Sequence, residues 1–248
     1  MMVINDSLIP LRDDDPALIH AKLSTSALKI LHYLNTHGHI GLTQSKAFNR
    51  KFVEWAAEAF YWPGYTPEEL YRYNKVLNEL DLPPLELLHW LLRELKLIRH
   101  YKLTCRLTKR GTTFLDRPGA LFNNLVPFFL FQVEHGNHYY PDRATVRPIE
   151  AFIPVIHDFS EANQVISATQ LRRAIFGPPP SQLVYDEIAS SIAFEVLKPL
   201  EWAGLLYEES DRTGSLHVTY TLTQLWNRAF WAQVDPPCAL VALSEPDI

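Results

Sequence analysis

Two groups of residues have types and spacings that could hold a metal ion. His32, His37 and His39 fall within eight residues, and Glu134, His135, His138 and Asp142 form the second group. An H-x-x-H spacing can bind zinc on a helix, but Gly136 and Asn137 indicate a loop at the second group. We favour polar loop histidines over ligands. Whether either group binds a metal stays open, and we predict no cofactor.

A run of basic residues between residues 93 and 117 is the strongest candidate for a binding surface. Eight basic and two acidic residues fall there, in a chain with a net charge of −5 and a pI of about 6.1. Lys and Arg bind phosphates by releasing counterions, so a local patch could bind double-stranded DNA although the whole molecule is acidic. The candidate nucleic-acid-binding residues are Arg93, Lys96, Arg99, Lys102, Arg106, Lys109 and Arg110.

The same charges also have a purely structural interpretation. Basic residues on an exposed hairpin deter edge-to-edge pairing and favour solubility. The helix expected before the hairpin presents a mixed outward stripe, formed by Glu86, His89, Arg93 and Lys96. Trp90 on this helix is better explained by packing than by stacking on a base. Nucleic-acid contact and surface solvation therefore remain alternatives at this point.

The elements that would position the patch form a pattern that the chain contains twice. The first copy has a helix over 85–95, a hairpin in which Leu103, Cys105 and Leu107 alternate with polar residues, and a helix N-capped by Thr108. The second copy aligns residues 193–206 and 222–230 with 85–98 and 107–115. A helix-turn-helix followed by a hairpin is the winged-helix arrangement. In such proteins the helix before the hairpin enters the major groove and the hairpin touches the backbone.

Capping and breaking residues predict the other helices. Asp15 and Pro16 indicate a helix start, a helix follows Thr43, and Thr66 to Glu69 form a capping box for a helix to about Leu80. Ser167 opens a short helix that ends at Gly177. Further predictions are a helix over 118–132 interrupted near Pro127, a helix near Pro154, a long helix from about Leu183 that is kinked at Pro199, and a hairpin turn over 211–214.

We therefore predict a mainly α protein with small β-hairpins (α+β), built from tandem winged-helix-like domains. The polar, proline-bounded stretch 136–148 marks the boundary between them. The expected segments are an N-terminal tail (1–18), a first domain with extra helices (19–135), a second domain (145–235) and a C-terminal tail (236–248).

Three further marks resemble a family. They are the "WPG" turn at 62–64, the "NKVLNE" helix at 74–79, and the "LTKRG" helix entry at 107–111 followed by Asp116-x-Pro118. Over about residues 40–132 the chain is similar to a group of uncharacterised bacterial proteins, with weaker likeness up to residue 230. A similar region occurs as a domain appended to a plasmid-borne family associated with mobile elements. The resemblance implies a family and carries no reaction or ligand.

The sequence lacks the motifs that mark several functional classes. No glycine-rich phosphate loop, nucleophile elbow or zinc-protease motif is visible, so we predict no enzyme. Cys105 and Cys238 are too few for a disulfide framework, and neither a signal peptide nor a stretch of about twenty apolar residues is seen. We expect a cytoplasmic protein with reduced thiols.

The functional prediction is a DNA-binding winged-helix protein with a regulatory or plasmid- and mobile-element-associated role. The alternative is a protein–protein interaction adaptor or dimerisation module without nucleic-acid binding. The second copy supports a partner of another kind, because Glu208, Glu209 and Asp211 in its hairpin would repel phosphate. That surface suits a protein partner or self-association.

Overall fold

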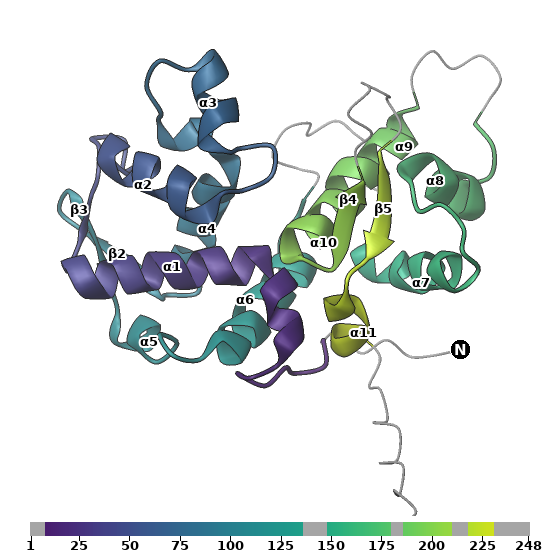
Figure 1. The fold of residues 1–248 in the computed structure, drawn as a ribbon, viewed down its shortest axis with the longest axis horizontal. Coiled ribbons are helices and arrows are strands. Elements are labelled where there is room, and N and C mark those ends of the chain that lie inside the picture. The colour runs from purple at the N-terminus through teal and green to yellow at the C-terminus, as the bar shows by residue number, and fades with distance from the viewer. Residues whose placement is uncertain (1–7, 136–147, 180–185, 210–217, 231–248) are drawn as a thin grey trace, which may run out of the picture.

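The computed structural model describes residues 8–135, 148–179, 186–209 and 218–230. It confirms a mainly α protein with small antiparallel sheets, organised in two halves (Figure 1). No described helix is long and apolar enough to cross a membrane.

The first half consists of helices around a small sheet. Its helices are η1 (Pro16–His20), α1 (Lys22–His37), α2 (Arg50–Phe60), α3 (Pro67–Tyr73), η2 (Glu79–Asp81), α4 (Pro83–Glu94), α5 (Lys109–Thr112) and α6 (Pro118–Gln132). Its strands are β1 (Ile40–Gly41), β2 (Ile98–Tyr101) and β3 (Thr104–Leu107), which form an antiparallel sheet in the order β1-β3-β2.

The second half is smaller and also places helices before a two-stranded hairpin and one helix after it. It contains η3 (Ile149–Ala151), α7 (Ile153–Glu161), α8 (Ala168–Phe176), α9 (Glu187–Ser191), the π-helical segment η4 (Ile192–Leu197), α10 (Lys198–Ala203), β4 (Leu206–Glu209), β5 (Thr219–Leu222) and α11 (Gln224–Phe230). Ile166 bridges to Tyr220 of β5, much as Ile40 of β1 pairs with Cys105 of β3.

Matching hydrogen bonds hold the two hairpins to their helices. The Thr108 hydroxyl donates to the Lys96 and Leu97 carbonyls, at 2.8 and 3.0 Å. The Thr223 hydroxyl donates to the carbonyls of Gly204 and Leu205, at 2.6 and 3.2 Å. These bonds make Lys96 and Gly204 equivalent positions, each at the end of the helix that precedes a hairpin.

The two halves pack against each other through one continuous core. α1 lies between them and contacts α4 and α6 of the first half and α10 of the second. Gly204, at a φ of 87°, lies so close to the His20 carbonyl that a Cβ there would overlap it. Beside it, the Lys22 ammonium lies 2.8 Å from the buried Glu201 carboxylate.

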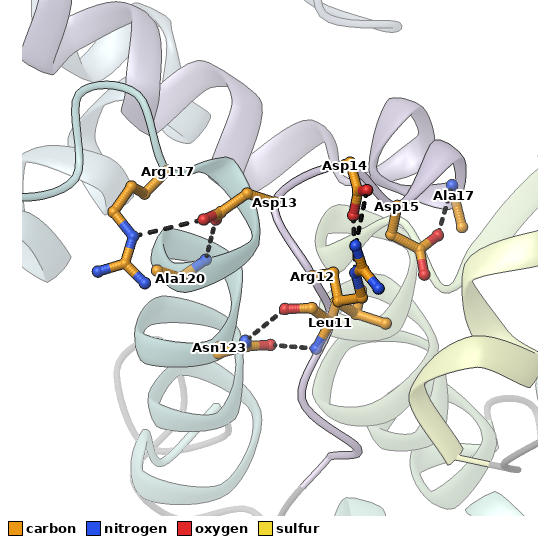
Figure 2. A network of polar contacts seen from close by, with 9 residues as sticks. All are labelled: Leu11, Arg12, Asp13, Asp14, Asp15, Ala17, Arg117, Ala120 and Asn123. Atoms are coloured by element: carbon orange, nitrogen blue, oxygen red, sulfur yellow. Dashed lines mark hydrogen bonds and ion pairs between the residues drawn. The ribbon is translucent and has the colours of Figure 1, made fainter.

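The segment 8–15 corrects the expected N-terminal tail, because it is bound to both halves. Leu8 and Leu11 are buried, and the Ile9 amide donates to the Ala229 carbonyl at 2.7 Å. Figure 2 shows Asn123 of α6 bonded to the Leu11 amide and carbonyl, both at 2.8 Å. The same view shows Asp13 accepting from the Ala120 amide at the start of α6, at 2.9 Å. The hydrogen bond from the Ala120 amide is the largest of the effects that together lower the pKa of the Asp13 carboxyl.

Two predicted helices are shorter than expected. The Thr43 hydroxyl bonds to Ala47 inside a tight turn, and α2 begins only after Asn49, whose side chain accepts from the Phe52 amide. α3 ends at Tyr73 rather than near Leu80, because the backbone of Asn74 is extended and its side chain donates to the Leu70 carbonyl. The "NKVLNE" stretch is therefore a turn leading into η2.

Other local predictions are confirmed. Thr66 and Glu69 form the reciprocal capping box, Asp15 caps η1, and Ser167 caps α8, which ends at Gly177. The predicted interruption near Pro127 is wrong, because α6 continues through this residue. The long helix of the second half widens into η4 just before Pro199, which has no N–H to donate. The boundary stretch up to residue 147, Leu183, the turn over 211–214 and the C-terminal tail lie outside the described residues.

Candidate nucleic-acid interface

The β2–β3 hairpin presents one face to the core and one to solvent. Ile98 and Cys105 point inward and are buried, whereas Arg99, Tyr101 and Arg106 are exposed. Arg99 and Arg106 are directly opposite each other in the register. Like charges at such positions destabilise a sheet, so the outer face is not explained by the stability of the hairpin.

The seven predicted basic residues are all exposed. We call them the basic hairpin surface: Arg93, Lys96, Arg99, Lys102, Arg106, Lys109 and Arg110. Within the described part of the chain none of the seven forms an ion pair. Figure 1 shows β2 and β3 on the left of the molecule, away from β4 and β5, so the described part of the second half lies away from this hairpin.

The seven residues follow the length of the hairpin. Arg93 and Lys96 lie at the end of α4, Arg99 and Arg106 in the middle of the outer face, and Lys102 in the turn. Lys109 and Arg110 lie in α5, where the chain leaves the hairpin. The Tyr101 ring lies close to two of the cations. The Arg106 guanidinium is 5.2 Å and the Lys102 ammonium 5.6 Å from its centroid. Cations and an exposed aromatic ring are therefore interleaved, as in surfaces that follow a nucleic-acid backbone.

Three lysines at this surface have backbone conformations that favour glycine. Lys96 and Lys102 have φ values of 58° and 54°, and Lys46, in the turn before α2, has 67°. The Lys46 ammonium reaches the Lys102 carbonyl at 3.3 Å, so it joins the tip of the hairpin. A left-handed conformation costs a non-glycine residue about 1–2 kcal/mol. The second half has Gly204 at the position equivalent to Lys96. The lysine at position 96 therefore has a backbone cost that glycine would avoid.

The expected outward stripe of α4 is wrong at its centre. His89 is buried and stacks on Phe48, with ring centroids 3.8 Å apart. Along α4 itself only Trp90, Arg93 and Glu94 are exposed, and the Trp90 ring lies 6.3 Å from that of Phe128. The solvent-facing side of this helix therefore consists of Trp90, Arg93 and Glu94, with Glu86 half-buried one turn before them, and it carries one cation. Contact with a duplex is left to the end of α4 and to the hairpin.

A buried polar chain under the hairpin was missed by the sequence analysis. Glu79 accepts the Phe48 amide at 2.5 Å and contacts His89 Nδ1 at 2.5 Å. His89 Nε2 lies 2.8 Å from His100 Nε2, and His100 is partly exposed on β2. The chain thus runs from the buried Glu79 to the surface. The ten-residue spacing of Glu79 and His89 is no motif, and the packing of η2 against α4 brings them together.

The other chemical candidates are not assembled into sites. His32, His37 and His39 are exposed along the end of α1 and up to β1, and His37 Nδ1 contacts the Tyr33 carbonyl at 2.9 Å. Among the described residues no group of three metal-ligating side chains comes together. Burial lowers the pKa of His135 to about 4, while His138 and Asp142 lie outside the described residues. Burial also raises the pKa of the Cys105 thiol to about 12, which removes its nucleophilic thiolate at neutral pH.

The charged residues that line the hollow beside the N-terminal segment are paired with one another. Its lining includes two opposed pairs, Arg12 with Asp14 and Arg117 with Asp13. Figure 2 shows both arginines turned toward these carboxylates. The charges cancel locally, unlike those of the basic hairpin surface.

The second half has the opposite chemistry at equivalent positions. Counting from the matching hydrogen bonds, Glu201 occupies the place of Arg93, Glu208 that of His100, and Thr221 that of Arg106. Glu201 and Glu208 both contact Lys198, at 3.3 and 3.1 Å. Glu208 is therefore paired within the second half, and the described residues of the second hairpin offer no comparable cationic surface.

Comparisons with known proteins match both halves. The model of the Y4jL N-terminal domain matches residues 19–120, and that of the y4jL C-terminal domain matches residues 144–224. A Sinorhizobium fredii protein named "Uncharacterized protein y4jL" is 48% identical over 103 residues, which are 42% of this chain and 47% of the relative. The chain thus covers about half of that relative's length. No solved structure matches the chain. Both domain models match in the order N-terminal domain and then C-terminal domain, so the chain is similar to the y4jL proteins of bacteria in both halves.

Proposed function

We propose that the chain is a tandem winged-helix protein that binds duplex DNA through the basic hairpin surface. The proposal includes a role in regulating or maintaining a plasmid or mobile element, which is supported only by the resemblance of the first domain. The order helix, short strand, two helices and hairpin supports the winged-helix assignment in each half. In the first half this order is α1, β1, α2, α4, β2 and β3, with α3 and η2 inserted. The sheet order β1-β3-β2 places the short strand beside the second strand of the hairpin.

One observation carries the proposal: seven exposed cations, none of them paired with a carboxylate among the described residues, follow a single hairpin in a chain of net charge −5. Each phosphate contact releases condensed counterions. Directly opposed arginines and lysines in left-handed conformations lower stability, and an anionic ligand would offset both costs.

The burial of α4 fixes the expected mode of contact. The exposed side of α4 has a single cation, Arg93, beside Trp90 and Glu94, so it offers few groups for reading base edges. The hairpin, the end of α4 and α5 can contact the sugar–phosphate backbone, which positions a protein on DNA without specifying sequence. We therefore expect sequence-tolerant binding with a strong salt dependence.

The test is a titration of fluorescent duplex DNA at several salt concentrations. With up to seven phosphate contacts, the logarithm of the affinity should fall with the logarithm of the salt concentration, with a slope no steeper than about −6. The double change Arg99→Gln and Arg106→Gln should make the slope shallower by about 2. In 0.1 M salt it should weaken binding roughly 60-fold.

A matched control removes two exposed arginines from the second half. Arg173→Gln together with Arg228→Gln makes the same change in net charge away from the hairpin. This variant should retain the wild-type slope. Equal losses in the two double variants, or no binding of duplex at low salt, would refute the proposal.

The alternative is an interaction adaptor, and a specific surface favours it. On α3 and the turn after it, Tyr71, Tyr73 and Leu80 are exposed, the last two at 83% and 70%. Glu54 and Glu58 of α2 lie near enough to Tyr71 to act on its hydroxyl. Exposed aromatic residues of this kind are enriched at protein interfaces. Failure of the duplex titration would leave this surface and the acidic second hairpin as the sites for a protein partner.

A further inference from the structure

The tip of the first hairpin exposes two large side chains that do not contribute to the core. Tyr101 is the last residue of β2 and is 48% exposed, and Leu103 in the turn is 40% exposed. Turns at a solvated surface usually carry glycine or small polar residues instead. The same outer face carries Arg99 and Arg106 in the middle of the hairpin. The cationic hairpin therefore ends in an aromatic and an aliphatic side chain.

Hydrogen bonds from other parts of the chain hold the backbone of this tip. The carbonyls of residues 101–103 each accept a donor from the protein. In chain order, the donors are the Thr104 hydroxyl at 2.7 Å, the Lys46 ammonium at 3.3 Å and the Leu42 amide at 2.9 Å. A tip held in this way loses little conformational freedom when a ligand contacts it. The backbone that carries the Tyr101 ring is therefore preorganised.

Two cations lie beside the Tyr101 ring. The Arg106 guanidinium and the Lys102 ammonium lie 5.2 and 5.6 Å from the ring centroid. Arg106 Nε also donates to the Thr104 hydroxyl at 3.4 Å, which holds this side chain on the outer face. Among the described residues neither cation has a carboxylate partner. The ring and both charges are thus available to one ligand that combines a planar group with negative charge, as a nucleotide does.

A fully paired duplex cannot use the Tyr101 ring for stacking. Within a duplex the faces of each base are covered by neighbouring base pairs, and only the base edges are exposed in the grooves. Exposing one of these faces requires unstacking, which costs free energy. An unpaired base has a free face already, and its stacking on an aromatic side chain stabilises complexes with single strands. The tip of the hairpin therefore suits an unpaired base.

Resting on the proposed function, we propose that the first hairpin binds the junction between duplex and single-stranded DNA. The basic hairpin surface contacts the duplex backbone, and the Tyr101 ring stacks on the first unpaired base. The order of the side chains fits this ligand, because the cations extend along the hairpin from the end of α4, whereas Tyr101 and Leu103 lie at its tip. Leu103 adds an apolar contact for the sugar of the unpaired nucleotide. The preferred DNA is therefore partly unpaired.

The test compares two DNA ligands that carry the same phosphates. Both contain one duplex with a short single-stranded extension, made of thymidines in the first ligand and of abasic nucleotides in the second. The wild type should bind the thymidine ligand roughly fivefold or more tightly, which is the lower end of what base–aromatic stacking contributes. Because stacking releases no counterions, the two ligands should give the same salt slope. Equal affinities would overturn the inference.

Substitutions of Tyr101 separate stacking from charge. Tyr101→Ala should remove the preference for the thymidine ligand, while Tyr101→Phe should retain it. Unchanged affinity of Tyr101→Ala for the abasic ligand shows that the hairpin is still folded. Tyr73→Ala removes an exposed tyrosine at the end of α3 and is the matched control, which should bind both ligands as the wild type does. A preference that survives in Tyr101→Ala, or is lost in Tyr101→Phe, contradicts stacking at this ring.

Photochemical crosslinking identifies the residue beside the base. With 5-iodouracil at the first unpaired position, irradiation of the complex with the full chain should link the base to Tyr101, as peptide mapping by mass spectrometry detects. A crosslink to a different aromatic residue would overturn the assignment.

A fully paired duplex tests the proposed function separately. Steep salt-dependent binding of this duplex, without any preference between the thymidine and abasic ligands, would overturn the inference and leave the proposed function intact. If the paired duplex does not bind at low salt, the proposed function is refuted, and the comparison of the two extended ligands still decides whether Tyr101 stacks on a base. Absence of binding to all three ligands refutes both.

Discussion

Replacing Lys96 with glycine should stabilise the protein while weakening its binding to DNA. Lys96 has a φ of 58°, and Gly204 occupies the equivalent position of the second half at 87°. Removing the side chain relieves a left-handed conformation that costs about 1–2 kcal/mol. Glycine also increases the conformational entropy of the unfolded chain, which subtracts about 0.5–1 kcal/mol from that gain. The net expectation is an increase of roughly 0.5–1 kcal/mol in the free energy of unfolding.

The loss of affinity follows from the counterion argument. Each phosphate contact contributes about 0.9 to the slope of log affinity against log salt. Losing one contact in 0.1 M salt therefore weakens binding up to about eightfold. Lys96→Ala is the matched control, because it removes the same charge but keeps a Cβ in the left-handed conformation. The two variants should lose affinity equally, and only the glycine variant should gain stability.

Urea unfolding and fluorescence anisotropy with labelled duplex measure the two effects separately. The glycine variant should raise the urea midpoint without changing the slope of the unfolding transition. The reasoning is refuted if glycine is no more stable than alanine at position 96. It is equally refuted if both variants retain wild-type affinity, because the strained lysine would then have no role at the surface.

Gly204→Ala should lower the free energy of unfolding by at least roughly 2 kcal/mol, since the new Cβ meets the His20 carbonyl at the contact between the halves; an unchanged urea midpoint would contradict this packing. Native Cys105 should resist thiol reagents at pH 8, as peptide mapping by mass spectrometry can test, because burial raises its pKa to about 12. The stability that Cys105 contributes is full below the pKa of an unfolded thiol and should be lost as the pH rises toward about 12. His100 and His135 have the opposite sign: their pKa values are lowered to about 4, so the unfolded chain binds more protons and stability should fall as the pH drops from about 6.5 toward 4. Replacing both residues with Gln should flatten the urea midpoint over that range.

Features that depend on near neighbours were predictable from the sequence. The capping box at Thr66, the cap at Thr108 and the alternation around Cys105 are all present. Their signals lie within four residues, where backbone geometry fixes which groups can meet. The exposure of the seven cations follows in the same way, because it needs only the alternation of the strands and the position of the turn.

Features that depend on distant segments were not predictable. The residues 8–15 read as a polar tail, but Asn123 and Ala120 lie more than one hundred residues away and bond to them. His89 fits an outward helical position until Phe48 covers it. Thr43 resembles a helix cap, yet its hydroxyl closes a turn that brings Phe48 and Lys46 to the hairpin. These contacts join segments that are far apart in the chain, so no spacing in the sequence could indicate them.

The ends of α4 and α10 carry opposite charges, because different residues contact each of them. At the end of α10, Gly204 lies against His20 and Glu201 is buried beside Lys22, so that position holds the two halves together. The equivalent end of α4 has no covering element, and Arg93 and Lys96 face solvent there. A buried helix end excludes phosphate whatever its charge, because an approaching duplex would meet α1. The proposed DNA contact is therefore accessible in the first half only. The acidic residues of the second hairpin do not weaken DNA binding there.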